Sequence, residues 1–123
     1  MIALMAGAVL VVDDDPIFRS LARRMLLCAG LVVVGEAESV ATAIAAAHAL
    51  RPDAALVDVG LPDGDGISLA RELTALPWRP RVVLTSADPW AASDRDIRAS
   101  GASAFVAKDN LPSAGLERLL TTG

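Results

Sequence analysis

Two short apolar runs of this chain each end in aspartates, and these carboxylates are the residues best suited to carry chemistry. Ala8–Val12 leads directly into Asp13–Asp15, and Ala54–Val57 leads into Asp58. A carboxylate at the end of a buried strand costs free energy unless it binds a cation or takes part in a reaction. Because the arrangement occurs twice, we expect both groups of acids to belong to one acidic site.

Further polar side chains end two later apolar runs. Thr85 and Ser86 end the run that begins at Arg81, and Lys108 follows Ala104–Ala107. In an open parallel sheet, ligands bind beyond the carboxyl ends of the strands. Neighbouring carboxylates suit Mg²⁺. An ammonium and a hydroxyl can bind a phosphoryl group, which a carboxylate beside the metal can attack. These residues therefore indicate Mg²⁺ and a phosphoryl group as ligands.

Strand-like and helix-like segments alternate five times, and this order places the polar residues. Continuous apolar runs are typical of strands buried on both faces. The expected strands are Val9–Val12, Leu31–Val34, Ala54–Val57, Arg81–Thr85 and Ala104–Ala107. The expected helices are Pro16 up to Gly30, Ser39–Leu50, Ile67–Leu76, Asp88–Ser100 and Pro112–Leu120. Short connections between them predict an α/β fold with a doubly wound parallel sheet, in one domain over residues 1–123.

The overall composition excludes several classes of protein. The 123 residues are 54% hydrophobic, which excludes a disordered chain, and the net charge of −4 argues against direct contact with nucleic acid or a membrane surface. No apolar run approaches the roughly 20 residues that cross a bilayer, and Met1–Ala6 lacks the basic leader of a secretion signal.

The single cysteine, Cys28, fits a reducing compartment and is expected to be buried. We therefore expect a cytoplasmic protein.

Several short motifs follow one another in a fixed order along nearly the whole chain. They are Val12-Asp13-Asp14, Asp58-Val59-Gly60-Leu61-Pro62 with Asp65-Gly66, Thr85, Gly101-Ala102 and Phe105-Val106-Ala107-Lys108. Together they resemble the receiver domain of two-component response regulators. The resemblance implies a flavodoxin-like (βα)5 sandwich with a five-stranded parallel sheet of order 2-1-3-4-5. It also implies a signalling switch that turns over no external metabolite, and so not an enzyme in the usual sense.

The resemblance assigns roles to the acidic residues. It implies that Asp58 is the phosphoacceptor. It also implies that Asp14 binds Mg²⁺ directly, that Asp13 binds it through water, and that Asp58 and the backbone carbonyl of Gly60 complete the protein ligands. The phosphoryl donor would be a sensor histidine kinase or a phosphotransfer protein.

The resemblance also assigns a switching role to the later residues. Lys108 would hold the phosphoryl group by charge, and the hydroxyl of Thr85, with Ser86 beside it, would move onto the new phosphoryl oxygens. The ring of Phe105 would follow Thr85 and alter the face made by the fourth helix, fifth strand and fifth helix. That face would bind a downstream protein partner, and the resemblance is compatible with a homodimer.

The chain departs from the common pattern at several positions. Lys108 is followed by Asp109 rather than proline, a variant that resembles receivers preceding helix-turn-helix DNA-binding domains. The sequence ends at Gly123, so we expect either a stand-alone receiver or the receiver part of a regulator whose DNA-binding domain is missing here. Gly60 and Ala87 have side chains too small to shield a phosphoryl group, and we expect solvent access to govern its hydrolysis.

Two alternative functions stay open at this point. Asp13-x-Asp15-x-Ile17 is close to the first motif of haloacid-dehalogenase-like phosphatases, in which Asp13 would be the nucleophile, although Asp58 would then have no role. The second alternative is a receiver-like scaffold that signals without phosphorylation, which the intact set of site residues disfavours.

Overall fold

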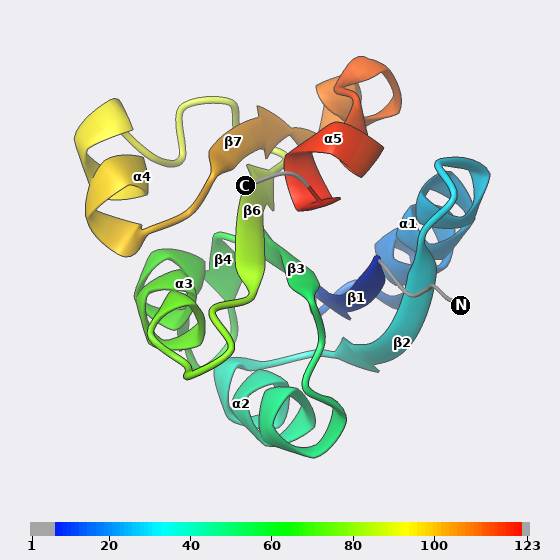
Figure 1. The fold of residues 1–123 in the computed structure, drawn as a ribbon. Coiled ribbons are helices and arrows are strands. Elements are labelled where there is room, and N and C mark those ends of the chain that lie inside the picture. Colours follow the sequence, from blue (N-terminus) through cyan, green and yellow to red (C-terminus); the bar gives the residue numbers. More distant parts are fainter. Residues whose placement is uncertain (1–6, 122–123) are drawn as a thin grey trace.

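The computed structural model describes residues 7–121, which form a five-stranded parallel sheet between helices (Figure 1). The strands are β1 (Ala8–Val12), β2 (Val32–Ala37), β3 (Ala54–Asp58), β6 (Arg81–Ser86) and β7 (Ala104–Ala107). Their order is β2-β1-β3-β6-β7, and every neighbouring pair is parallel. The predicted fold class and strand order are therefore confirmed. The stretch considered above as a secretion signal lies outside the described residues.

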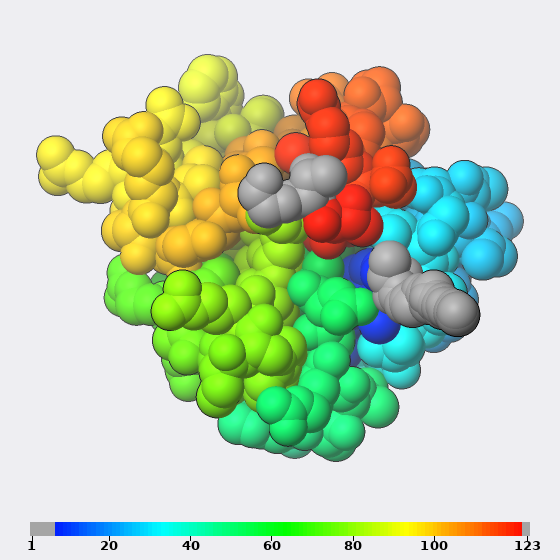
Figure 2. All heavy atoms as spheres, in the orientation of Figure 1, coloured from blue at the N-terminus to red at the C-terminus, as the bar shows by residue number. Residues whose placement is uncertain are grey.

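The helices cover both faces of the sheet. They are α1 (Pro16–Cys28), α2 (Val40–Leu50), α3 (Gly66–Thr74), α4 (Asp94–Ser100) and α5 (Leu116–Thr121). One core cluster joins α1 and α5 to Val9 and Leu56, and the other joins α2 and α3 to Leu10 and Val57. Figure 2 shows only a small patch of the blue atoms of β1 between the surrounding elements. Among the helices of residues 7–121, none has both the length and the apolar character needed to span a bilayer.

The strand order places the predicted acids at one point of the sheet. β1 pairs with β2 on one side and with β3 on the other, so the chain reverses its direction of winding between β1 and β3. Ligand sites of open α/β sheets lie outside the carboxyl ends of the strands at this reversal. Asp13 follows β1 and Asp58 ends β3, which brings the two carboxylates to the reversal point.

The second strand is longer than its apolar run indicates. The sequence predicted Leu31–Val34, whereas β2 covers Val32–Ala37 and includes Gly35 and Glu36. β2 lies at the edge of the sheet and its residues are alternately more and less exposed, so a polar residue can occupy its outer positions. Because the prediction required a continuous apolar run, its strand ends at Val34, three residues before the end of β2.

The fourth helix begins later than predicted. It starts at Asp94 rather than Asp88, because Ser93 is its N-cap: the Ser93 hydroxyl accepts a hydrogen bond from the backbone N–H of Asp96 at 3.1 Å. The Asp88 carboxylate instead accepts a bond from the N–H of Trp90 at 2.9 Å, which forms a local turn. Both aspartate and serine are good N-caps, and the predicted helix start at Asp88 is wrong.

The last predicted helix is two elements. Lys108–Ser113 forms a 3₁₀-helix, η2, that contains Pro112, and α5 begins only at Leu116. Gly115 separates them with a φ of 70°, a left-handed conformation that interrupts a helix. The prediction of one helix over Pro112–Leu120 is therefore wrong in its first half.

Cys28 is exposed, so the expectation of a buried thiol is also wrong. The buried residues of α1 are Phe18, Ala22 and Leu26, which recur every four residues. Cys28 follows Leu26 by two residues, or about 200° around a helix, and so lies on the opposite face.

The loop after β3 folds into a small antiparallel hairpin, β4 (Gly60–Leu61) and β5 (Gly64–Asp65). Gly66 follows the hairpin and donates its N–H to the carbonyl of Val59 at 2.7 Å. A Cβ atom on Gly66 would overlap the main-chain carbonyl of Asp58, whereas one on Gly60 would have no atom within 4 Å. The close approach at Gly66 fixes the backbone beside Asp58.

We predict that Gly66→Ala destabilises the protein by about 1–3 kcal/mol, because the added methyl group must displace backbone rather than a flexible side chain. The matched control Gly60→Ala, in the same hairpin, should change the unfolding free energy by less than about 0.5 kcal/mol. Urea unfolding of both variants measures this. Equal unfolding free energies for the two variants would contradict the close packing at Gly66.

Candidate functional site

Three carboxylates meet at the reversal point of the sheet. One oxygen from each of Asp13, Asp14 and Asp58 lies within 4.8 Å of the others. Asp13 is fully buried and Asp58 is 8% exposed, whereas Asp14 is exposed. The single acidic site expected from the two apolar runs therefore forms.

Asp13 is held at both its backbone and its side chain. Its N–H donates to the carbonyl of Ala37 at 3.0 Å, and its own carbonyl accepts from Nη1 of Arg19 at 2.6 Å. Oδ1 of Asp13 accepts from the N–H of Asp15 at 2.9 Å. Oδ2 forms an ion pair with Nζ of Lys108 at 2.8 Å. This buried oxygen keeps the capacity to bind a cation.

Lys108 lies between a carboxylate and an aromatic ring. Its ammonium is 2.8 Å from Oδ2 of Asp13 and 4.1 Å from the centroid of the Phe18 ring, an arrangement that combines an ion pair with a cation–π contact. The side chain of Lys108 is only 20% exposed. Lys108 was predicted at the site from the sequence, whereas Phe18 was not. The position of Phe18 in the first turn after the three aspartates was the available signal.

Asp58 has an unusual proton affinity. Burial, followed by the charge of Asp13, raises the pKa of the Asp58 carboxyl from 3.8 to about 6. The ammonium of Lys108 and a hydrogen bond from the backbone of Gly60 act in the opposite direction. Because the charge of Asp13 contributes to the raised pKa even with Lys108 present, a divalent cation would relieve the repulsion between the acids.

Thr85 and Ser86 lie at the same edge of the sheet, beside the acids. Thr85 pairs in register with Asp58, and its hydroxyl donates to the carbonyl of Val106 at 2.6 Å. The Ser86 hydroxyl accepts from the N–H of Asp88 at 3.1 Å. Both hydroxyls therefore have partners among the described residues.

Phe105 and Gly60 occupy different surroundings. The Phe105 side chain is half-buried on β7, where it packs against the core cluster shared with α2 and α3. It is thus on the strand next to Thr85 but outside the group of acids. Gly60 is exposed in the hairpin that follows Asp58.

Two further contacts at the site were missed from the sequence. Arg19 reaches the backbone of Asp13 from α1, and the Asp63 carboxylate accepts hydrogen bonds from the N–H groups of Val40 and Ala41. These bonds lower the pKa of Asp63 and join the hairpin to the start of α2. The partners of Asp63 are more than 20 residues away, and the bond of Arg19 goes to a backbone carbonyl, which no residue type marks.

The set of donors fits Mg²⁺. It consists of the carboxylate oxygens of two buried aspartates and one exposed aspartate, with no cysteine or histidine among the three clustered residues. Mg²⁺ prefers such oxygen ligands and retains several waters, so few protein ligands suffice. The fully buried carboxylate of Asp13 and the raised pKa of the neighbouring Asp58 are both expected of an acidic cluster that binds a cation.

Comparisons with known proteins agree on one family. Residues 9–120 match the response regulator receiver domain. The chain is 42% identical over 109 residues to the DNA-binding transcriptional activator DevR/DosR of Mycobacterium tuberculosis, which covers 85% of this chain and 48% of that protein. It is 31% identical over 104 residues to the chemotaxis protein CheY of Bacillus subtilis, covering 85% of this chain and 87% of CheY.

A solved structure gives the same result. The signal receiver domain of the response regulator NarL from Mycobacterium tuberculosis superimposes with a TM-score of 0.77 at 34% identity, and covers 93% of this chain and 96% of that domain. The chain spans about half the length of curated relatives such as DevR/DosR, whereas it spans most of CheY. It belongs to the receiver-domain family of two-component response regulators.

Proposed function

We propose that this receiver is phosphorylated on Asp58 by a histidine kinase or a phosphotransfer protein, in a reaction that requires Mg²⁺. The observation that carries the proposal is the group of three carboxylates around Asp58, with the ammonium of Lys108 beside it. An oxygen of Asp58 attacks phosphorus while the P–N bond of the donor's phosphohistidine breaks, and the imidazole leaves with the bonding electrons and then takes up a proton. Mg²⁺, when bound, neutralises charge on the phosphoryl oxygens.

The residues of the proposed metal site divide into ligands and a nucleophile. Asp13, Asp14, Asp58 and the carbonyl of Gly60 would hold Mg²⁺, with Asp13 acting through water. Both oxygens of Asp13 are already engaged, one by the N–H of Asp15 and the other by Lys108. This engagement supports Asp58, rather than Asp13, as the nucleophile and disfavours the phosphatase alternative.

Phosphorylation would act through Lys108 and Thr85. A phosphoryl group on Asp58 adds negative charge within reach of the ammonium, and its oxygens offer Thr85 a stronger acceptor than the carbonyl of Val106. Ser86 lies next to Thr85 and would assist. Moving Thr85 away from Val106 would disturb β7, and the ring of Phe105 on that strand would follow.

The output would pass to a partner. We propose that the face formed by α4, β7 and α5 binds a downstream protein, a DNA-binding domain in the same regulator or a second copy of the chain. The half-length match to DevR/DosR supports a receiver that works with a DNA-binding domain, and the match to CheY supports a stand-alone receiver. In either case the protein would act in the cytoplasm, where it turns over no external metabolite and does not bind nucleic acid itself.

We predict that acetyl phosphate with Mg²⁺ adds one phosphoryl group to the wild-type chain and none to Asp58→Ala. A matched control is Asp53→Asn, which alters the carboxylate just before the same strand, β3, and should still gain one group. Intact mass spectrometry, followed by peptide mapping, reads the result. Modification of Asp13, or catalytic hydrolysis of a phosphomonoester, would instead favour the phosphatase.

The raised pKa of Asp58 predicts how stability depends on pH in the absence of Mg²⁺. The folded protein binds this proton more tightly than the unfolded chain, so the stabilisation is complete below 3.8 and is lost as the pH rises through about 6. Asp58→Asn removes the penalty and should be more stable than the wild type at neutral pH, with the gain vanishing toward 3.8. Urea unfolding across this range tests it, and a constant difference between the two proteins would contradict it.

The lifetime of the phosphoryl group gives a separate prediction. Gly60 is exposed with open space around its Cα, so an asparagine side chain fits there and can cover the phosphoryl group from water. We expect Gly60→Asn to slow the loss of the phosphoryl group, whereas Gly60→Ala should leave it nearly unchanged. Mass spectrometry after removal of the donor follows the decay. Identical rates in the wild type and Gly60→Asn would refute control by solvent access.

A further inference from the structure

We propose that Arg19 is a positioning residue for the metal site, and that it acts by fixing the peptide bond between Asp13 and Asp14. The inference rests on the proposed function, since it concerns the same Mg²⁺ site. Arg19 touches neither the Asp14 carboxylate nor that of Asp58 in the described structure, so its role differs from that of a ligand.

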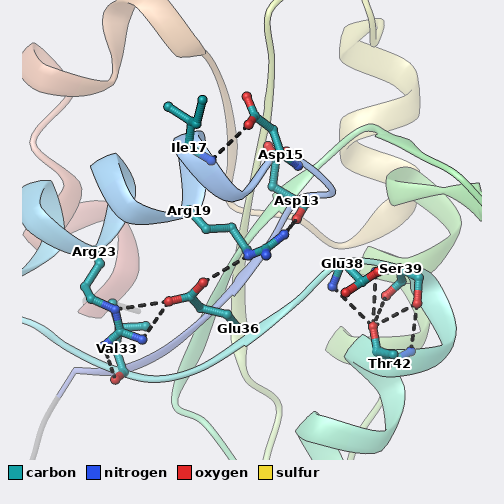
Figure 3. A network of polar contacts seen from close by, with 10 residues as sticks. All are labelled: Asp13, Asp15, Ile17, Arg19, Arg23, Val33, Glu36, Glu38, Ser39 and Thr42. Atoms are coloured by element: carbon teal, nitrogen blue, oxygen red, sulfur yellow. Dashed lines mark hydrogen bonds and ion pairs between the residues drawn. The ribbon is translucent and has the colours of Figure 1, made fainter.

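Arg19 bridges two elements that are distant in sequence. Its Nη1 donates to the carbonyl of Asp13 at 2.6 Å, and its Nε donates to Oε1 of Glu36 on β2 at 2.9 Å. Figure 3 shows the guanidinium lying between these two acceptors. The side chain of Arg19 is only 17% exposed, so water competes weakly for the two bonds.

Glu36 is itself fixed by a second arginine. Arg23, one turn along α1, donates from Nε and Nη2 to Oε2 of Glu36, at 3.1 and 2.7 Å (Figure 3). The hydrogen bond from Arg23 is the largest cause that lowers the pKa of Glu36. Glu36 is therefore a charged acceptor that binds Arg19 through Oε1, while Arg23 occupies the other oxygen, Oε2.

The peptide bond beside Asp13 matters because of Asp14. Asp14 is exposed, and no hydrogen bond or ion pair of its carboxylate is found within residues 7–121. Its direction toward the cluster therefore depends on the backbone that carries it. The carbonyl held by Arg19 belongs to the peptide unit shared by Asp13 and Asp14, so the bond from Arg19 limits rotation of that unit.

A positioning role and a purely electrostatic role predict opposite effects. Arg19 carries a positive charge next to Asp13, a residue of the acidic cluster, and its removal would by charge alone strengthen the binding of Mg²⁺. Loss of the bond to Asp13 frees the peptide unit and weakens binding, as the loss of outer contacts does at other metal sites. The direction of the change in affinity therefore separates the two roles.

The chain offers a matched control in Arg23. Arg23 binds the same carboxylate of Glu36 and carries the same charge on the same helix, but its hydrogen bonds within residues 7–121 go to Glu36 and to the carbonyl of Val33, not to Asp13. Arg23→Gln thus removes an arginine and an ion pair of Glu36 while it leaves the bond to Asp13 intact.

The test is a titration of the full 123-residue chain with MgCl₂, followed by ¹H–¹⁵N NMR, with thermal unfolding recorded for each variant. We expect Arg19→Gln to weaken Mg²⁺ binding about tenfold. Arg23→Gln should change it by no more than about twofold, because exposed ion pairs contribute little. Glu36→Gln should weaken binding in the wild-type background and have no further effect in Arg19→Gln, since it acts through Arg19.

The possible outcomes are distinct. Unchanged or tighter binding by Arg19→Gln, or an equal loss in Arg19→Gln and Arg23→Gln, would overturn the positioning role while the proposed function stands. Absence of Mg²⁺ binding by the folded wild type would instead refute the proposed function. If Arg19→Gln does not fold, Arg19→Lys decides: it keeps the charge but lacks the planar fork that reaches both acceptors, so weaker binding supports the role and wild-type binding refutes it.

Discussion

The structure depends on the burial of two carboxylates next to one another. Asp13 is completely buried and Asp58 nearly so. One carboxylate oxygen of each lies within 4.8 Å of one from the other. Such burial is costly, and the raised pKa of Asp58 is a direct expression of that cost. The contacts of the Asp13 carboxylate with the N–H of Asp15 and with Lys108 lower the cost without removing it. The negative charge that these contacts leave unbalanced favours the binding of a cation at a receiver domain's acidic site.

The fold brings these carboxylates together through its connections. Strands buried on both faces must be apolar along their length, so polar groups can appear only where a strand ends. The reversal between β1 and β3 then leaves space at the carboxyl ends of these two strands, and β6 and β7 bring Thr85 and Lys108 to the same edge. The chemistry of the site thus follows from the position of each strand in the sheet.

The sequence was sufficient for the parts that depend on local pattern. The apolar runs predicted all five strands of the main sheet, and the aspartates that end two of them predicted the acidic cluster. It failed where a choice depends on distant contacts. The choice between Asp88 and Ser93 as helix cap is a separate case, because the local capping box of Ser93 with Asp96 favours Ser93 and was overlooked. Arg19, Glu36 and Phe18 were missed because their partners lie on other elements and no local motif records such pairs.

A switch requires a ligand that contacts two states differently, and the contacts seen here define one of those states. Lys108 is bound to Asp13 and Phe18, and the hydroxyl of Thr85 is bound to Val106. A phosphoryl group on Asp58 would compete for both Lys108 and Thr85, so the free energy available for switching is the difference between the new contacts and the ones lost. Because the contacts of Asp13 with Ala37 and Arg19 involve its backbone, they do not enter that competition. Under the proposed function, the backbone at Asp13 would therefore stay fixed while the contact between Thr85 and Val106 of β7 changes.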